Sequence, residues 1–257
     1  MSKLIASTMT HRTFTLAEAL ERLSAAGFKS VELLSGGTWV PHFDAANADD
    51  ALIASTAAIV AASGMGVHCI NTSESDLKSI ENLAALGQAV GAGFLTIPCG
   101  GNPPEGKSRA DAIAERAKHS SKAADITERY GLKLAIEAPH KNTLAECSAQ
   151  IDEYWAAQDK RIFCTFDTAH LTFAGEDILP VAAKYAPRII HCHLRDAIKG
   201  NSLMKYGEGI VDFGAFVETV RAGGYDGCFS MEYPADSNED APVLLARSIE
   251  YLSKFNI

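Results

Sequence analysis

Short apolar runs alternate with longer stretches of helical periodicity along the chain, and this pattern predicts repeated strand–helix units. In the first repeat, the apolar run 3–8 is followed by leucines and alanines at helical spacing over 16–23. Thr15 precedes this stretch with Glu18 three residues later, which is typical of a helix N-terminus. Gly27 follows it and predicts its end.

This strand–helix unit occurs eight times along the chain. The predicted strands are rich in apolar and β-branched residues and cover 3–8, 28–34, 65–70, 94–98, 132–137, 161–167, 188–194 and 225–232. The predicted helices cover about 16–26, 47–63, 75–90, 109–130, 144–158, 178–185, 213–222 and 241–255, with an extended loop over 195–212.

Strands that alternate with amphipathic helices pair in parallel through right-handed crossovers. Eight such units in a chain of 257 residues predict an α/β fold, a (β/α)₈ TIM barrel that forms a single domain over 1–257. A doubly wound open sheet is the alternative. Its dinucleotide-binding version lacks support, because no Gly-x-Gly-x-x-Gly follows the first strand.

Composition narrows the class of protein. With 47% apolar and 21% charged residues, the chain can bury one substantial core. Its apolar runs are shorter than the ~18 residues of a membrane span, and the first residues form no extended apolar signal region. The six cysteines show no Cys-x-x-Cys spacing, so we expect reduced, buried thiols in a soluble, cytoplasmic protein.

The formal net charge of −9 argues against a broad nucleic-acid-binding surface. We therefore expect a small-molecule partner, with no nucleic acid and no membrane. A homo-oligomer is left open by the sequence.

Four successive predicted strands end in side chains that bind metals: Glu137, Asp167, His193 and Glu232. In a (β/α)₈ barrel the active site lies at these strand ends. Three buried carboxylates close together are strongly unfavourable unless a cation neutralises them, so the pattern predicts one divalent metal ion. His191 lies two residues before His193 and would also face the interior, one layer deeper.

The ligand types indicate which metal. Three carboxylates and one imidazole form an oxygen-rich set that leaves two positions of an octahedron open. Such a set favours Mn²⁺, with Mg²⁺ or Co²⁺ as alternatives, and disfavours tetrahedral Zn²⁺.

Further polar and aromatic residues are candidates for substrate contact. Glu32 and His68 close the second and third predicted strands; Glu32 positions a ligand or has a structural role, and His68 orients a substrate hydroxyl or is an inert buried histidine. His140 follows Pro139 beside the predicted metal ligand of the fifth strand. Trp39, in the long second loop, walls the pocket or only packs against it.

Most of the chain resembles a known family, and the second half carries the specific motifs. The residues that carry the resemblance are Glu137, Asp167-Thr-Ala-His170, His191-Cys-His193-Leu-Arg-Asp196, Gly207-Glu-Gly209-Ile-Val-Asp212-Phe and Gly224-Tyr-Asp-Gly227 with Ser230-Met-Glu232. They resemble the xylose isomerase-like TIM-barrel superfamily, the sugar phosphate isomerase/epimerase group that includes ketose 3-epimerases, inosose dehydratases and endonuclease IV.

This resemblance implies roles for particular residues. In ketose 3-epimerases the corresponding Glu, Asp, His and Glu bind the metal, and the two glutamates are also acid and base on opposite faces of the substrate. It therefore implies that Glu137 and Glu232 are catalytic here. His170 and Lys199 fall where the epimerases have a substrate-binding His and Arg.

The sequence also departs from the epimerase pattern. Thr143 stands where the epimerases carry a further substrate-binding Glu, and the turn from Glu137 to His140 is closer to dehydratase-like branches. The Asp-x-His of endonuclease IV is missing from the segment 207–209, which argues against that activity.

These observations predict a divalent-metal-dependent isomerase or epimerase of a small sugar or keto-sugar that acts through an enediolate. The alternative is a metal-dependent lyase, a dehydratase of a keto-cyclitol or keto-sugar. A third class, a non-catalytic carbohydrate-binding barrel or subunit, is disfavoured by the intact pair of glutamates.

Overall fold

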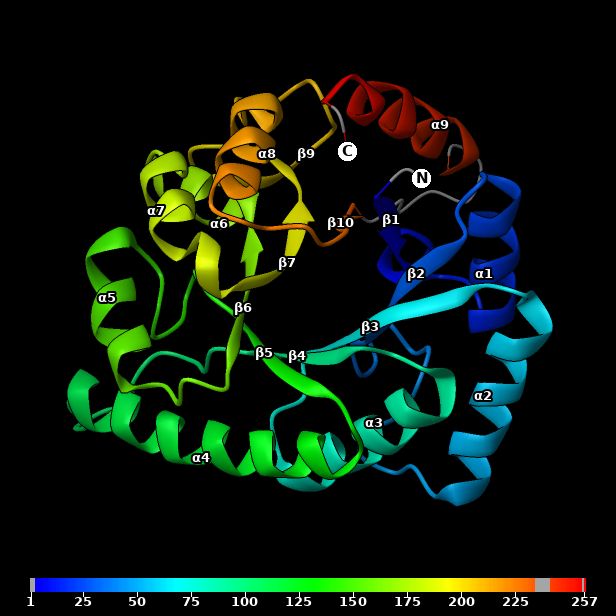
Figure 1. Ribbon diagram of the computed structural model, residues 1–257, viewed down its shortest axis with the longest axis horizontal. Helices are drawn as coiled ribbons and strands as arrows, with labels where there is room; N and C mark the ends of the chain where they lie inside the picture. The colour runs from blue at the N-terminus through cyan, green and yellow to red at the C-terminus, as the bar shows by residue number, and fades with distance from the viewer. Residues whose placement is uncertain (1–2, 234–240, 256) are drawn as a thin grey trace.

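In the computed structural model, which describes residues 3–233, 241–255 and 257, eight parallel strands close into a barrel (Figure 1). Its strands are β1 (Leu4–Ser7), β2 (Ser30–Ser35), β3 (Gly66–Thr72), β4 (Phe94–Pro98), β5 (Lys133–Glu137), β6 (Phe163–Asp167), β7 (Ile189–Leu194) and β10 (Phe229–Met231). They follow the order β1-β10-β7-β6-β5-β4-β3-β2, which confirms the predicted (β/α)₈ barrel.

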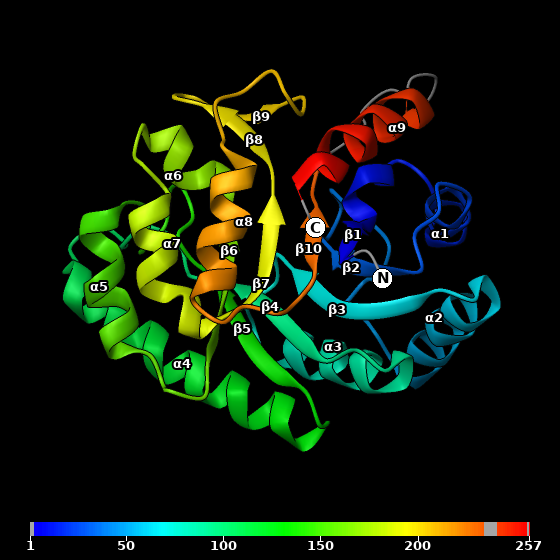
Figure 2. The same cartoon turned by 45° about the horizontal axis from the view of Figure 1, so that its top comes forward.

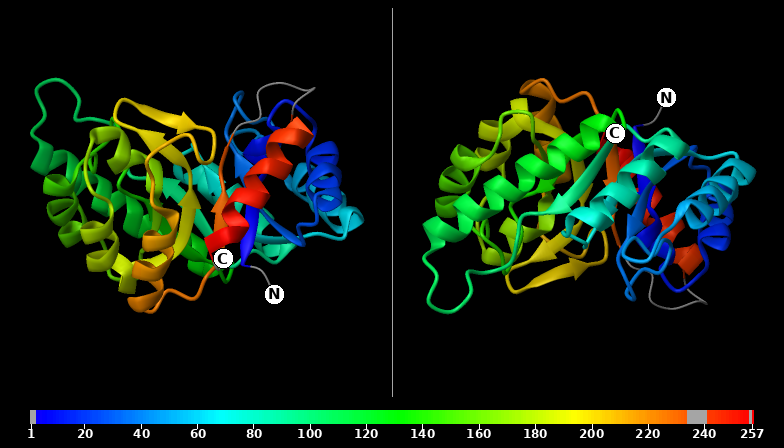
Figure 3. Two further views of the ribbon diagram at one scale, coloured as in Figure 1. Left: turned by 90° about the horizontal axis from the view of Figure 1, so that it is seen from above. Right: turned by 90° about the horizontal axis from the view of Figure 1, so that it is seen from below.

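Helices form a layer outside the strands, as the views from above and below show (Figure 3). They are α1 (Leu16–Ala25), α2 (Asp50–Ser63), α3 (Leu77–Val90), α4 (Arg109–Arg129), α5 (Ser148–Ala157), α7 (Leu179–Tyr185), α8 (Phe213–Ala222) and α9 (Ala241–Leu252). Within the described residues, none of the helices combines the length and apolar character that a membrane crossing requires.

Local sequence signals explain where helices begin and end. Thr15 accepts a hydrogen bond from the backbone N–H of Glu18, whose side chain accepts one from the backbone N–H of Thr15, so the predicted cap of α1 is present. Gly64 and Gly91 end α2 and α3 with φ of 68° and 74°, a conformation that glycine adopts without steric cost.

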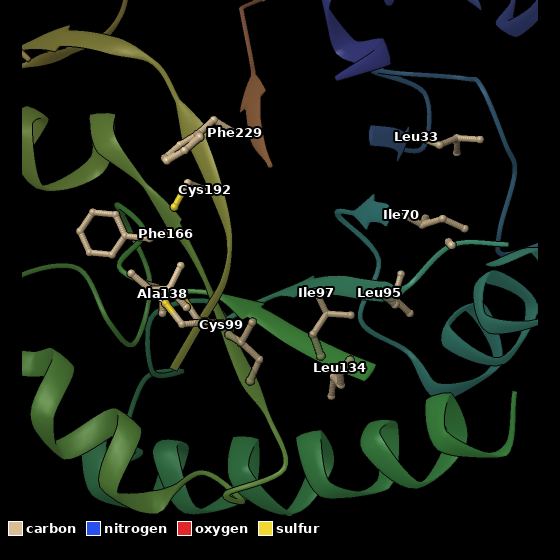
Figure 4. Packing of buried hydrophobic residues seen from close by; sticks show 14 of the residues in the cluster. Leu33, Ile70, Leu95, Ile97, Cys99, Leu134, Ala138, Phe166, Cys192 and Phe229 are labelled. Carbon is tan, nitrogen blue, oxygen red and sulfur yellow. Dashed lines mark hydrogen bonds between the residues drawn. The ribbon is translucent and has the colours of Figure 1, made fainter. Parts of the chain in front are cut away.

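Strand alternation separates the outer core from the barrel interior. Phe166 of β6 packs against Phe216 of α8 with ring centroids 5.4 Å apart, on the outer side of the sheet. Figure 4 shows Phe166, Cys192 and Phe229 on the neighbouring strands β6, β7 and β10. Thr165, the residue before Phe166, hydrogen-bonds to Thr96 of β4 across 2.8 Å in the interior. Asp167, two residues after Thr165, therefore also faces inward.

Two segments differ from the prediction. His170 falls between the predicted strand 161–167 and the predicted helix 178–185, where a loop is expected, but it lies on the short helix α6 (Thr168–Ala174). The stretch expected as an extended loop contains a hairpin of β8 (Asp196–Ile198) and β9 (Asn201–Met204) that lies beyond the end of β7 (Figure 2). Short 3₁₀ turns over Thr8–His11, Ala186–Arg188 and Ser253–Phe255 complete the fold.

Glu32 and His68 do not close their strands. Each is the third residue of its strand, because β2 continues to Ser35 and β3 to Thr72. The pairing of these strands shifts register between Val31 and Glu32. Both side chains therefore lie deeper along the barrel than the sequence suggested.

Candidate metal centre

Four side chains converge at the C-terminal end of the barrel. Glu137 and Asp167 are the last residues of β5 and β6, His193 is the fifth residue of β7, and Glu232 directly follows β10. Strand register aligns them, since Asp167 pairs with His193, and His193 with Ser230. One ligand atom from each of the four lies within 4.8 Å of the others. The structure thus brings together the four residues that the strand-end pattern singled out.

The imidazole of His193 is at the centre of this cluster. Its Nδ1 lies 3.5 Å from Glu137 Oε1, 3.8 Å from Asp167 Oδ2 and 3.4 Å from Glu232 Oε2. The side chains of His193 and Asp167 are fully buried. Nδ1 has no hydrogen-bond partner within the described part of the chain. A buried nitrogen without a donor or acceptor, aimed at three carboxylates, fits a metal ligand.

The cluster carries more negative charge than its surroundings neutralise. Burial, with the nearby charge of Glu137, raises the pKa of Glu232 to about 8. Burial alone would lower the pKa of His193, but Glu232 and Glu32 outweigh it and raise the pKa well above its usual value. In the absence of a cation, His193 therefore carries a proton that a divalent cation would displace from Nδ1. The donor set, three carboxylates and one imidazole, fits an Mn²⁺- or Mg²⁺-type ion.

The pKa of Glu137 is shifted in the opposite direction to that of Glu232. Burial acts to raise the pKa of Glu137, but contacts with His170 and His193 outweigh it and hold the pKa well below its usual value. In the absence of a cation the two glutamates thus differ in protonation: Glu137 is ionised, and Glu232 holds a proton near neutral pH.

Arg195 reaches into the same cluster. Its Nε donates to Asp167 Oδ2 across 2.7 Å and lies 3.5 Å from Glu232 Oε2, and its side chain is mostly buried. Burial would raise the pKa of Asp167, but the guanidinium charge outweighs it and lowers that pKa. Its terminal nitrogen also lies 2.7 Å from His170 Nε2. From the sequence, Arg195 and Lys199 are both candidates for a cationic contact with a substrate group. The spacing of two between His193 and Arg195 also continues the inward-facing alternation of β7.

A profile of the family described as the xylose isomerase-like TIM barrel matches residues 20–255. The chain belongs to this family. The family resemblance expected from the sequence is therefore confirmed.

Individual members of the xylose isomerase-like family match over different lengths. Inosose dehydratase from Geobacillus thermodenitrificans is 30% identical over 149 residues, which are 49% of this chain and 50% of that protein. The chain spans about half the length of the curated relatives it matches. The 3-keto-D-glucoside 4-epimerase from E. coli has a TM-score of 0.77 at 17% identity, covering 99% of this chain and 100% of that one. The IolI protein, crystallised with a zinc atom, has a TM-score of 0.74 at 15% identity, covering 99% of both chains.

At these identities the solved structures show a shared fold. The family includes epimerases and dehydratases that act on small sugar-like molecules.

In this xylose isomerase-like barrel, two further predicted residues lie beside the cluster. His170 Nε2 is 3.3 Å from Glu137 Oε1, and the His140 ring packs against His170 at a tilt of 41°, with centroids 3.8 Å apart. His140 is half-buried, whereas His170 is buried. Burial lowers the pKa of His170 to about 4, so its imidazole is neutral near pH 7.

Three other predicted contact residues lie elsewhere. His68 packs against Phe94 and His191, with ring centroids 5.4 and 5.7 Å apart, below the cluster. The half-exposed Trp39 lies under the guanidinium of Arg12. Lys199 is exposed at the turn of the β8–β9 hairpin, where its carbons cover Gly175. A role of these three in substrate binding stays a prediction, and the structure does not place them in the cluster.

Lys141 is a cation that the sequence did not single out. Its Nζ donates to Ser202 Oγ across 2.7 Å and lies 4.9 Å from the ring centroid of Phe173. Burial and the charge of Arg195 lower its pKa. The sequence could have indicated Lys141 through its position directly after His140, in the turn that follows β5.

Thr143, which stands where the epimerases carry a further substrate-binding Glu, has a structural role in this protein. Its hydroxyl donates to the carbonyl oxygen of His140 and accepts from the backbone N–H of Ala145, and Cys99 Sγ lies 3.0 Å from it. The side chain is buried in the turn after β5 and shapes that turn. The hydroxyl group of Thr143 therefore contacts other residues of the protein, namely His140, Ala145 and Cys99.

Proposed function

We propose that this protein is a divalent-metal-dependent isomerase or epimerase of a small sugar or keto-sugar. The observation that carries the proposal is the cluster around His193 Nδ1, which joins a metal-type donor set to two glutamates that reach it from different strands. A divalent cation there supplies positive charge that stabilises an oxyanion developing next to a C–H bond that loses its proton.

The two glutamates approach the cluster from different directions. Glu137 belongs to β5 and Glu232 follows β10, and β6 and β7 separate these strands in the barrel order. Two carboxyl groups on different sides of a bound molecule can act on opposite faces of one carbon. Ionised Glu137 takes the proton next to the carbonyl, which leaves an enediolate. Glu232, the glutamate that binds a proton more readily, then gives a proton to the same carbon in an epimerase, or to the neighbouring carbon in an isomerase.

The remaining residues position these groups and limit the access of water. Arg195 holds Asp167 through its Nε–H, and neutral His170 lies beside Glu137. The packed rings of His140 and His170 form one wall of the cluster. Imidazole nitrogens at this wall are suited to hydrogen-bond sugar hydroxyls.

A dehydratase is the second candidate, and the match to inosose dehydratase favours it. The same first step leads to loss of water when a hydroxyl group occupies the next carbon. The acidic glutamate then gives its proton to that hydroxyl, which leaves as water. The structural role of Thr143, in the position of an epimerase substrate contact, agrees with this alternative.

Proton NMR in D₂O distinguishes these reactions. The purified protein is incubated with Mn²⁺ and a panel of ketoses, keto-glycosides and keto-cyclitols, with Asp167→Asn as the control. Deuterium at carbon with an unchanged substrate formula supports isomerisation or epimerisation, and loss of a hydroxyl with a new enol or enone supports the dehydratase. If no divalent cation changes the melting temperature and no substrate changes, both proposals are wrong and a non-catalytic barrel is indicated.

A further inference from the structure

The side of His193 that faces away from the carboxylate cluster meets another buried carboxylate. His193 Nε2 lies 3.0 Å from Glu32 Oε2, and both side chains are fully buried. The neutral imidazole that binds a cation carries hydrogen on one nitrogen and a lone pair on the other. An ionised carboxylate at hydrogen-bond distance accepts a hydrogen from Nε2, which leaves the lone pair on Nδ1. Nδ1 is the atom that faces Glu137, Asp167 and Glu232.

Several further residues contact the carboxylate of Glu32. Its Oε2 also lies 2.5 Å from His191 Nε2, and Asn71 Nδ2 donates to its Oε1 across 3.3 Å. The thiol of Cys69 lies 3.9 Å from Oε2. These partners come from β3 and β7, so Glu32 is fixed by the barrel itself and not by a loop. A carboxylate with this many donors has little freedom to turn away from His193.

We propose that Glu32 is a positioning residue, which keeps the hydrogen of His193 on Nε2 and thereby directs Nδ1 at the bound cation. This inference rests on the metal site proposed above. Residues that accept the second N–H of a metal-binding histidine fix the orientation of its ring, and their removal typically weakens metal binding about 10- to 100-fold. His191 and Asn71 support Glu32 in this role by occupying its other hydrogen-bonding positions.

The same buried atoms also satisfy a different interpretation. Glu32, His191 and His193 each offer a ligand atom within 4.8 Å of the others, as a second cation site would require. Two nitrogens contact a single oxygen at 2.5 and 3.0 Å, which is the geometry of two N–H groups that share one acceptor. The hydrogen-bonded arrangement is therefore favoured, and the number of bound ions separates the two.

Metal titration of matched variants tests the inference. Glu32→Met removes the acceptor at similar side-chain length, and Glu32→Gln keeps one oxygen but cannot accept from every partner. Thr96→Val is the control, because it breaks a buried hydrogen bond to Thr165 inside the barrel without touching His193. Calorimetric titration with Mn²⁺ is expected to give one ion per wild-type chain, with about 10- to 100-fold weaker binding for Glu32→Met and a smaller loss for Glu32→Gln. Thr96→Val should lower the melting temperature and leave the Kd unchanged.

A second readout needs no variant. Long-range ¹H–¹⁵N NMR of wild-type protein loaded with diamagnetic Zn²⁺ should show His193 with hydrogen on Nε2 and none on Nδ1. Hydrogen on Nδ1, a Kd for Glu32→Met within about twofold of wild type, or two ions per chain would each overturn the positioning role. Absence of metal binding by the wild-type protein would instead remove the metal site on which the inference rests.

Discussion

Arg195 and Asp167 form the shortest ion pair of the carboxylate cluster, with Nε 2.7 Å from Oδ2. The guanidinium also lies 3.5 Å from Glu232 Oε2, so one fixed positive charge faces two of the four proposed metal ligands. A divalent cation bound to the cluster would neutralise the same carboxylates. Arg195 and the cation are therefore expected to compensate in part for each other's loss.

Arg195→Met should destabilise the cation-free protein more than the cation-loaded protein. Removing one partner of a buried ion pair leaves an uncompensated charge and costs roughly 3 kcal/mol. With saturating Mn²⁺ the cation supplies the missing charge, so Arg195→Met should lower the free energy of unfolding by less. Urea unfolding of wild type and variant, with Mn²⁺ and with chelator, measures this difference.

Lys199→Met is the matched control, because Lys199 is an exposed cation at the hairpin turn. Its effect on stability should stay within about 0.5 kcal/mol in both conditions. An equal loss for Arg195→Met with and without cation would show that the arginine and the ion do not share their carboxylates.

Asp196 organises the loop that follows the β8–β9 hairpin. Its Oδ2 accepts from the backbone N–H groups of Gly207 and Gly209 at 2.8 and 3.0 Å, and its Oδ1 accepts from Val211 N–H at 3.3 Å. A Cβ on Gly209 would lie 2.0 Å from Asp196 Oδ1. This contact explains why an aspartate and a Gly-x-Gly segment occur together in the motif.

Gly209→Ala and Asp196→Asn should each destabilise the protein by about 1.5–3 kcal/mol, the range for buried hydrogen bonds to a charged group. Amide hydrogen exchange at Gly207 and Gly209 should accelerate in Asp196→Asn. Gly101→Ala is the control, because a Cβ there meets no atom within 4 Å. Unchanged protection at both glycines would contradict the assigned role of the aspartate.

The sequence predicted the barrel and the four converging residues because both follow from strand alternation. Residues two apart on a strand share a face, so Asp167 follows Thr165 and His193 follows His191 into the interior. Parallel strands in a closed barrel bring their carboxyl ends together, which turns four strand ends into one cluster.

The errors arise where local periodicity carries little signal. Helix α6 has seven residues, and β8 has three, too few for a period to stand out. The depth of Glu32 depends on the register shift beside Val31, which pairing between strands determines. The hairpin also directs the side-chain carbons of Lys199 onto Gly175, a contact that the spacing of Lys199 from His193 does not indicate. Tertiary geometry of this kind is not encoded in spacing along the chain.

Stability should fall as the pH drops from about 6.5 to 4, in part because of His11. This side chain is 1% exposed, and neither ring nitrogen has a hydrogen-bond partner among the residues described. Burial, followed by the charge of Arg22, lowers the pKa of His11 from 6.5 to about 4. Between these values the unfolded chain binds the proton and the folded chain does not, so protonation favours unfolding.

Replacing this histidine with phenylalanine should flatten the pH dependence. His11→Phe retains the ring contact with Phe14 and removes the titrating group. The difference in unfolding free energy between variant and wild type should change by about 1–2 kcal/mol from pH 7 to pH 4, after allowance for solvent screening. The range from pH 7 to 8 is the internal control, because His11 is neutral there in both states. Parallel curves for the two proteins down to pH 4 would refute the assignment.

The different proton affinities of Glu137 and Glu232 predict different defects when each is replaced by glutamine. Either substitution should lower kcat by about 10²- to 10⁴-fold, the usual contribution of a positioned acid or base. Glu232→Gln keeps the ionised Glu137, which can still remove a substrate proton and return a deuteron from D₂O to the same face. We therefore expect hydrogen exchange without net conversion in Glu232→Gln, and loss of both in Glu137→Gln.

The comparison is made at equal metal occupancy, because both residues are also proposed ligands. Metal content is measured for each preparation, and rates are compared at saturating Mn²⁺. Glu146→Gln, a half-buried carboxylate outside the cluster, should keep full turnover. Exchange that persists in Glu137→Gln but disappears in Glu232→Gln would reverse the two roles. Full turnover in both variants would exclude Glu137 and Glu232 as the acid–base pair.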